Sequence, residues 1–189
     1  FSFWNKLKLA SVRKSSMKKN DILIKVLSLA FFARRNGLKI AVAESCTGGL
    51  LASLLSSLAG SSAWFEFGVV CYSNLSKKTF LSVDLDTIKL HGSVSKVVAY
   101  QMLAGLERIP PEKKNQFYLF STITGIAGPT GGGEKKPKGL VWFGFQSFGD
   151  KSCKNSIFSG NRMQIRNLAV RAALEGLISA GARKKQGNN

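Results

Sequence analysis

The stretch AVAESCTGGL (Ala41–Leu50) predicts a buried strand that turns sharply into a helix, and the rest of the chain is interpreted around it. A mostly apolar run, Leu38–Ala43, leads into Glu44 and Ser45, and a glycine pair then opens a run of small and apolar residues. A helix N-terminus presents unpaired N–H groups and a partial positive charge. Two roles are therefore open for the hydroxyls of Ser45 and Thr47: a nucleophile beside amides that stabilise an oxyanion, or a helix cap.

Composition places the chain among globular proteins with one main domain. Its 189 residues, 44% of them hydrophobic, are enough to form a buried core, and no apolar run approaches the roughly 18 residues that cross a bilayer. The formal net charge is +18, and basic residues gather at both ends. We expect a basic N-terminal arm over residues 1–19, a folded domain over residues 20–181 and a basic tail over residues 182–189.

The charge and the cysteines limit the class of function. The basic residues form no nucleic-acid-binding motif, so we expect no specific nucleic-acid partner, and the charge instead favours the approach of anionic substrates. The three cysteines lie far apart without a CxxC pair, so neither a zinc site nor a redox pair is predicted. Their odd number and the lack of an apolar signal region predict a reducing, cytoplasmic location.

Apolar runs that alternate with helical periodicity predict a three-layer α/β/α domain with a mixed sheet. Phe65–Ser73 is almost continuously apolar, which predicts a central strand, and Gly149–Asp150 is typical of a hairpin turn. The predicted strands are residues 38–43, 65–73, 117–123, 140–148 and 152–159. The predicted helices are residues 21–35, 47–58, 74–81, 84–90, 93–108 and 161–180. Ser93 and Asn161 are the expected caps of the last two.

Three polar or glycine-rich segments follow predicted strands: Ser45–Gly49, Tyr72–Lys77 and Thr124–Gly133. Ligand sites in such sheets lie at the C-terminal ends of strands. We therefore expect the three segments to converge on one cleft.

A serine nucleophile in that cleft needs a base. The only histidine, His91, precedes a glycine in a predicted surface turn. The alternative is a lysine whose pKa is depressed by burial or by neighbouring positive charge, and Lys77 and Lys78 both follow the second strand closely. Either lysine is also typical of a solvated surface, so the residue types alone leave the base undecided.

The glycine-rich loop matches no standard nucleotide-binding loop. Gly128–Gly133 has the spacing of a Walker A motif, but Glu134 stands where that motif needs lysine. Glycine-rich backbone can still cradle a phosphate. A ligand-binding loop and a plain hairpin loop both stay open.

Arg162 and Arg166 stand four residues apart at the start of the last predicted helix. Cations there are unfavourable to the helix dipole. The placement indicates either an anion bound between them or a solvated face.

Taken together, six segments resemble the CinA C-terminal domain family, the nicotinamide-nucleotide amidohydrolases (PncC). They occur in the order of the family and span about residues 21–180. The segments are AESCTGG (Ala43–Gly49), YSNxxK (Tyr72–Lys77), HGSVS (His91–Ser95), ITGIAGPTGG (Ile123–Gly132), KPKGLVW (Lys136–Trp142) and GNRMQIR (Gly160–Arg166).

The resemblance implies hydrolysis of the carboxamide of nicotinamide mononucleotide (NMN) to nicotinic acid mononucleotide and ammonia, as part of pyridine nucleotide salvage, with no metal and no cofactor. It implies Ser45 as nucleophile, Lys77 as base and Tyr72 as a hydrogen-bonding residue near the pair. The implied substrate-binding residues are Thr47, Gly48, Gly49, Thr124, Gly125, Gly128, Gly131 and Arg162, with backbone donors from the first three and Arg162 meeting the phosphate or stabilising the cleft. We also expect a homo-oligomer, with a dimer favoured.

One departure from the family lies in the last motif, which usually reads Gly-Asp-Arg, whereas Asn161 stands here. The change either weakens the orientation of Arg162 or exchanges one helix cap for another. Two other functions stay open. One is a catalytically weak nucleotide-binding or competence/damage-associated module built on the same site, and the other is a nucleic-acid-associated protein, suggested by the net charge.

Overall fold

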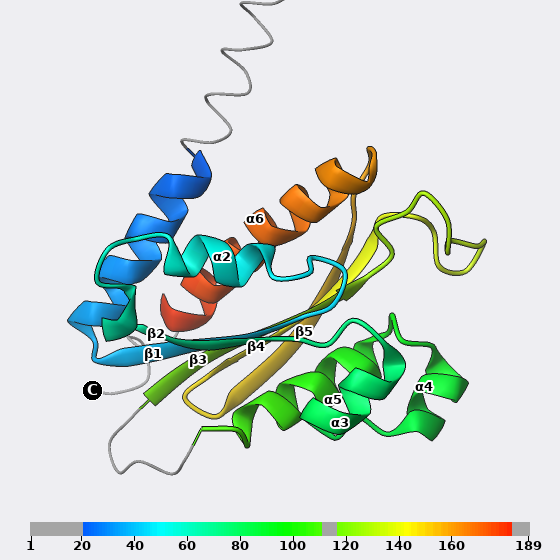
Figure 1. The fold of residues 1–189 in the computed structure, drawn as a ribbon, viewed down its shortest axis with the longest axis horizontal. Helices are drawn as coiled ribbons and strands as arrows, with labels where there is room; N and C mark the ends of the chain where they lie inside the picture. Colours follow the sequence, from blue (N-terminus) through cyan, green and yellow to red (C-terminus); the bar gives the residue numbers. More distant parts are fainter. Residues whose placement is uncertain (1–20, 111–116, 183–189) are drawn as a thin grey trace, which may run out of the picture.

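Five strands form one mixed sheet in the order β2-β1-β3-β4-β5 (Figure 1). The computed structural model describes residues 21–110 and 117–182 of the chain. In it, β1 (Leu38–Glu44) pairs in parallel with β2 (Phe65–Val70) and β3 (Phe117–Gly125). The antiparallel strands β4 (Leu140–Ser147) and β5 (Asp150–Ile157) extend the sheet beyond β3. The predicted mixed sheet is confirmed.

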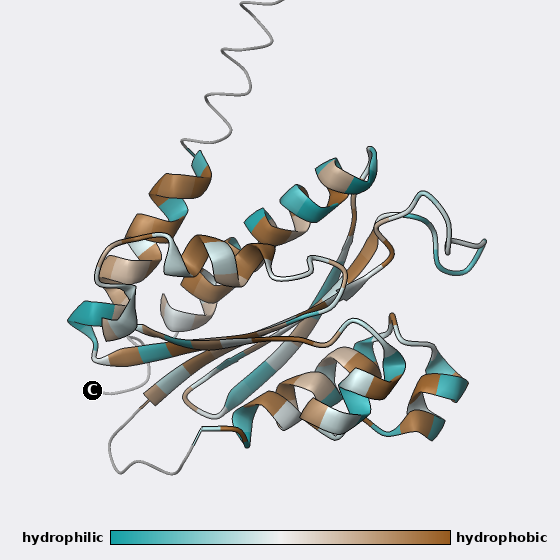
Figure 2. Cartoon of the chain, viewed as in Figure 1, coloured by the Kyte–Doolittle hydropathy of each residue, from teal (hydrophilic) through white to brown (hydrophobic). Residues whose placement is uncertain are grey.

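Helices cover both faces of the sheet, which confirms the predicted three layers (Figure 1). One layer holds the helix over residues 21–35, α2 (Leu50–Ser56), the short 3-10 helix η1 (Ser61–Ala63) and α6 (Arg162–Ala182). The other holds α3 (Asn74–Leu81), α4 (Leu85–His91) and α5 (Lys96–Glu107). Each layer packs its own apolar cluster against the sheet, and the middle strands are mostly apolar in Figure 2.

The prediction of a central strand over Phe65–Ser73 is wrong. β2 lies at an edge of the sheet, and its residues alternate between half-buried and exposed. The strand ends at Val70, and Ser73 instead caps α3 by accepting a hydrogen bond from the Ser76 amide at 3.0 Å. A run of apolar residues indicates a strand, but its place in the sheet depends on which partners pair with it.

The starts of α5 and β5 also differ from the prediction, for local reasons. Ser95, not Ser93, caps α5, because its Oγ accepts from the Val98 amide at 3.3 Å. β5 begins at Asp150, directly after a tight turn in which Phe148 and Gly149 both have positive φ. The predicted hairpin is present, but its turn is formed by Phe148 and Gly149 and not by Gly149 and Asp150.

The predicted N-terminal arm, the tail beyond Ala182 and residues 111–116 lie outside the described residues. Among the helices that the structure does describe, none is long and apolar enough to cross a membrane.

Candidate active site

The segments that follow β1, β2 and β3 meet at one end of the sheet. The parallel strands β1 and β3 pair in register up to Glu44 opposite Ile123, so the residues after them leave at the same end. The Ser45 amide donates to the Ile123 carbonyl at 2.9 Å, and the Cys71 amide donates to the Glu44 carbonyl at 2.7 Å. The expected convergence is therefore present in the backbone.

Ser45 and Lys77 lie in contact, although 32 positions separate them in the sequence. The Lys77 Nζ donates to the Ser45 Oγ at 2.9 Å, and it also donates to the carbonyls of Cys71 at 3.0 Å and Tyr72 at 3.2 Å. Three donated bonds describe the ammonium form. In the neutral amine, two N–H groups still donate to the two carbonyls, and the lone pair accepts from the Ser45 hydroxyl at the same 2.9 Å contact. The arrangement can therefore accept the proton of Ser45.

Burial lowers the pKa of Lys77. Its side chain is 1% exposed, and it forms no ion pair within the part of the chain that the structure describes. Desolvation disfavours the ammonium form and is the largest effect on this pKa, while the thiols of Cys71 and Cys46 act in the opposite direction. Lys77 thus becomes neutral at a lower pH than an exposed lysine. Lys78, the other candidate from the sequence, is exposed.

The turn after β1 differs from the prediction, because α2 begins after Gly49 and not at Thr47. Gly48 (φ 57°) and Gly49 (φ 90°) adopt the left-handed conformation that favours glycine. Their amides are already used, since Gly48 donates to the Ser45 carbonyl and Gly49 to the Glu44 carboxylate, each at 3.1 Å. Of the three expected backbone donors, only the Thr47 amide has no hydrogen bond to another described residue.

Glu44, for which the sequence pattern predicts no role, supplies the cap of α2. Its carboxylate accepts hydrogen bonds from three amides: Gly49 (3.1 Å), Leu51 (3.1 Å) and Ala52 (2.8 Å). The alternative in which Ser45 or Thr47 caps this helix is therefore wrong. The sequence signal for Glu44 is an acid at the end of a buried strand, shortly before a helix.

Two arginines of α6 reach the turn and the glycine-rich loop. Arg162 donates to the Gly128 carbonyl at 2.8 Å and to the Tyr72 hydroxyl at 2.7 Å, and Arg166 donates to the Thr47 carbonyl at 2.7 Å. The arginines do not lie on a merely solvated face. The Tyr72 carbonyl accepts a hydrogen bond from Lys77. The Tyr72 hydroxyl is expected near the Ser–Lys pair, but it instead accepts a hydrogen bond from Arg162.

The glycine-rich loop reaches the site only in part. Thr124 is 1% exposed, and its Oγ1 donates to the Ser93 carbonyl, just before α5, at 2.8 Å. Gly125 lies against Cys46, because a Cβ built on this glycine would be 3.0 Å from the Cys46 Sγ. A Cβ on the exposed Gly131, in contrast, would meet only Ile126, at 3.8 Å. The structure thus brings Gly125 and Gly128 to the site and leaves Gly131 outside it.

Asn161 caps α6, which favours the simple exchange of one helix cap for another. Its Oδ1 accepts from the Gln164 amide at 3.0 Å, and the Gln164 Oε1 accepts from the Asn161 amide at 2.8 Å. We expect Asn161→Asp to change the free energy of unfolding by less than about 0.5 kcal/mol, and Asn161→Ala to lower it by about 1 kcal/mol. Denaturant unfolding measures both, and a large loss in Asn161→Asp would contradict the role as a cap.

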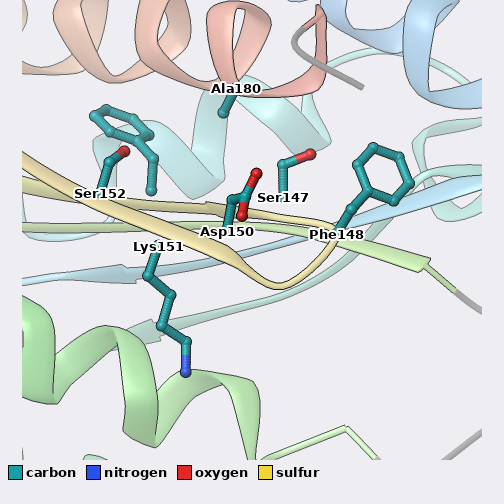
Figure 3. Close-up of a pocket in the computed structure, with 7 residues that line it drawn as sticks. Ser147, Phe148, Asp150, Lys151, Ser152 and Ala180 are labelled. Carbon is teal, nitrogen blue, oxygen red and sulfur yellow. The ribbon is translucent and has the colours of Figure 1, made fainter. Parts of the chain in front are cut away.

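Two cavities lie away from this site. The one in Figure 3 has a volume of about 280 Å³ and is formed by the β4–β5 turn and Ala180 of α6, at the opposite end of the sheet from Ser45. The other, of about 620 Å³, lies between the helix over residues 21–35 and Trp64. Within residues 21–110 and 117–182, no group of three or more His, Cys, Asp or Glu side chains is placed to hold a metal ion. The candidate site is therefore identified by its side-chain chemistry and not by cavity size.

Most of the chain is similar in sequence to known proteins. The profile of the CinA C-terminal domain matches residues 25–180. The nicotinamide-nucleotide amidohydrolase PncC of Escherichia coli (strain K12) is 41% identical over 145 residues, which cover 76% of this chain and 85% of that protein. A CinA-like protein of Syntrophomonas wolfei is 43% identical over 156 residues, which cover 82% of this chain but only 36% of that longer protein.

Solved structures show the same fold. The competence/damage inducible protein CihA from Agrobacterium tumefaciens superposes with a TM-score of 0.79 at 36% identity, and covers 85% of this chain and 95% of that one. A competence-damaged protein (CinA) superfamily member from Escherichia coli superposes with a TM-score of 0.77 at 32% identity, and covers 84% and 90%.

Proposed function

The chain belongs to the CinA C-terminal domain family, and we propose that it is a nicotinamide-nucleotide amidohydrolase. The reaction is hydrolysis of the NMN carboxamide to nicotinic acid mononucleotide and ammonia, a step of pyridine nucleotide salvage. The observation that carries the proposal is the 2.9 Å contact between the Ser45 Oγ and the Nζ of the buried Lys77. The name of the Escherichia coli relative supports the choice of substrate class.

Lys77 is the base that activates Ser45. In the neutral amine, two N–H groups donate to the carbonyls of Cys71 and Tyr72, and the lone pair takes the Ser45 proton. The serine oxygen forms a bond to the carboxamide carbon, and negative charge moves to the carboxamide oxygen. The Thr47 amide, which has no other hydrogen bond to a described residue, is the donor for this oxyanion.

Collapse of the tetrahedral intermediate releases ammonia. Lys77 returns its proton to the amide nitrogen as the C–N bond breaks, which leaves an ester of the nicotinate carboxyl on Ser45. The neutral lysine then takes a proton from water, whose oxygen attacks the ester. Ser45 recovers its proton, and nicotinic acid mononucleotide leaves, so one water is consumed for each ammonia.

The charges of NMN fit those of the site. Its pyridinium ring is cationic, and a like charge near Lys77 disfavours the ammonium form, in addition to the effect of burial. Its phosphate is anionic and pairs with Arg162, whose guanidinium lies between Tyr72 and the Gly128 carbonyl. The net charge of +18 favours the approach of this anion.

Incubation of the purified chain with NMN in ¹⁸O-labelled water tests the proposal. We expect ammonia and nicotinic acid mononucleotide in equal amounts, with one ¹⁸O in the product carboxylate. Release of free nicotinamide would contradict attack on the carboxamide. A rise in melting temperature with NMN but no ammonia would favour the second candidate, a nucleotide-binding module on the same site.

Arg162→Met tests the contact to the phosphate. We expect the KM for NMN to rise by about 10- to 100-fold, because a hydrogen bond to a charged group contributes about 1.5–3 kcal/mol. The KM for nicotinamide riboside, which lacks the phosphate, is expected to change little. Tyr72→Phe is the matched control, since it removes only the hydroxyl that Arg162 contacts. Equal increases in KM for the two substrates would contradict the contact to the phosphate, and would show that Arg162 instead holds the glycine-rich loop in place.

A further inference from the structure

Glu44 is a fully buried carboxylate that binds three backbone amides of one short segment. It is the last residue of β1 and is 0% exposed. The Oε2 accepts from the amides of Gly49 and Leu51, each at 3.1 Å, and the Oε1 accepts from the Ala52 amide at 2.8 Å. Across the described residues, no lysine or arginine forms an ion pair with it. The three amides are therefore what offsets the desolvation of this carboxylate.

These bonds close the turn that carries the nucleophile. Glu44 directly precedes Ser45, and its three donors stand at the start of α2, so residues 45–48 are held at both ends. Within the turn, the Gly48 amide donates to the Ser45 carbonyl at 3.1 Å, and the Ser45 amide donates to the Ile123 carbonyl at 2.9 Å. The amide and the carbonyl of Ser45 are both hydrogen-bonded, so its backbone is fixed. Only rotation of the side chain then determines whether the Oγ reaches Lys77.

We infer that Glu44 is a positioning residue for the proposed reaction. It fixes the turn so that the Ser45 Oγ stays in contact with the Lys77 Nζ, and so that the Thr47 amide stays free to bind the oxyanion. The inference rests on the proposed function, but Glu44 acts through the turn and not on the substrate. Proton transfer needs a heavy-atom distance of about 2.6–3.2 Å, which the present 2.9 Å satisfies. A displacement of about 1 Å can lower a rate by about a hundredfold, so a looser turn has a large effect on catalysis.

Glu44→Gln tests the carboxylate with little change of shape. Its amide oxygen can replace one carboxylate oxygen and accept from Gly49 and Leu51, but its NH₂ group then faces the N–H of Ala52. Glu44→Ala removes all three bonds. Leu177→Ala is the matched control. Leu177 is a buried residue of α6, so this change creates a cavity in the apolar core and is expected to lower stability without changing the turn that carries Ser45.

Three measurements separate a positioning role from a structural one, all at a temperature where each variant is folded. For Glu44→Gln we expect amide hydrogen exchange at least about tenfold faster in a peptide covering residues 45–52. We expect labelling of Ser45 by phenylmethylsulfonyl fluoride to slow by about ten- to a hundredfold, and kcat on NMN to fall by about a hundredfold. KM is expected to stay within about threefold, and Leu177→Ala to match wild type in all three measurements.

The labelling keeps this inference distinct from the proposed function. If the wild type releases no ammonia but its Ser45 is labelled, the proposed function fails, and slower labelling in Glu44→Gln still supports the positioning role. Labelling and kcat at wild-type levels in Glu44→Gln, with fast exchange in residues 45–52, would overturn the inference. Equal losses in Leu177→Ala would overturn it as well. Absence of labelling in the wild type would overturn both the inference and the mechanism.

Discussion

Ser45→Ala is expected to lower the kcat for ammonia release from NMN by at least about a thousandfold. The proposed mechanism forms a covalent bond between the Ser45 Oγ and the carboxamide carbon, and alanine has no atom that can form it. Residual turnover would have to use water directly, held by the lysine and the turn. Coupled detection of ammonia, calibrated against the signal without enzyme, measures the loss.

The variant is expected to stay folded and to bind NMN. Among the described residues, the Ser45 side chain makes one hydrogen bond, to Lys77, so the expected loss of stability is about 1 kcal/mol. Ser53→Ala is the matched control, because it removes an exposed serine hydroxyl from α2. Ammonia release by Ser45→Ala at the rate of Ser53→Ala would contradict the role of Ser45 as nucleophile. A melting temperature that still rises with NMN would show that the loss is one of catalysis.

The elements of this fold were largely predictable, because most of them have a local cause. The apolar run before Glu44 gives a strand, and periodic apolar residues give α5 and α6. The place of β2 at the sheet edge was not predictable, since Phe65–Val70 is as apolar as a strand at the centre of a sheet. Its position depends on the pairing of β1 with β3, which is set by residues far along the chain.

The side chains of the candidate site were easier to predict than their partners. Motif positions place Ser45 and Lys77, and the structure brings them into contact. The lysine, however, is held by main-chain carbonyls, and any residue type at positions 71 and 72 offers the same carbonyl. Glu44 was missed for a related reason, because its partners are amides. Sequence patterns report side chains, and this site is held in place largely by backbone groups.

Lys77→Met is expected to lower kcat on NMN by at least about a thousandfold, because the site then lacks its base and the group that protonates the leaving amide nitrogen. Methionine is similar in length and apolar, so it can fill the same buried volume. Lys78→Met is the matched control, since it removes the neighbouring exposed lysine of the same helix. Retained activity in Lys77→Met, or its loss in Lys78→Met, would contradict the assignment of the base.

The pH dependence of kcat/KM tests the same lysine in the wild type. The ammonium form has no lone pair for the Ser45 proton, so activity is expected to rise with pH and to level off above the pKa of Lys77. Burial lowers that pKa from 10.5, which moves the plateau to lower pH than an exposed lysine would give. The unfolded chain binds this proton more readily, so the free energy of unfolding falls as pH is lowered between the two pKa values. In Lys77→Met we expect that pH dependence of stability to be reduced. An unchanged stability profile, together with kcat/KM that is flat in the wild type, would show that Lys77 does not titrate as the base.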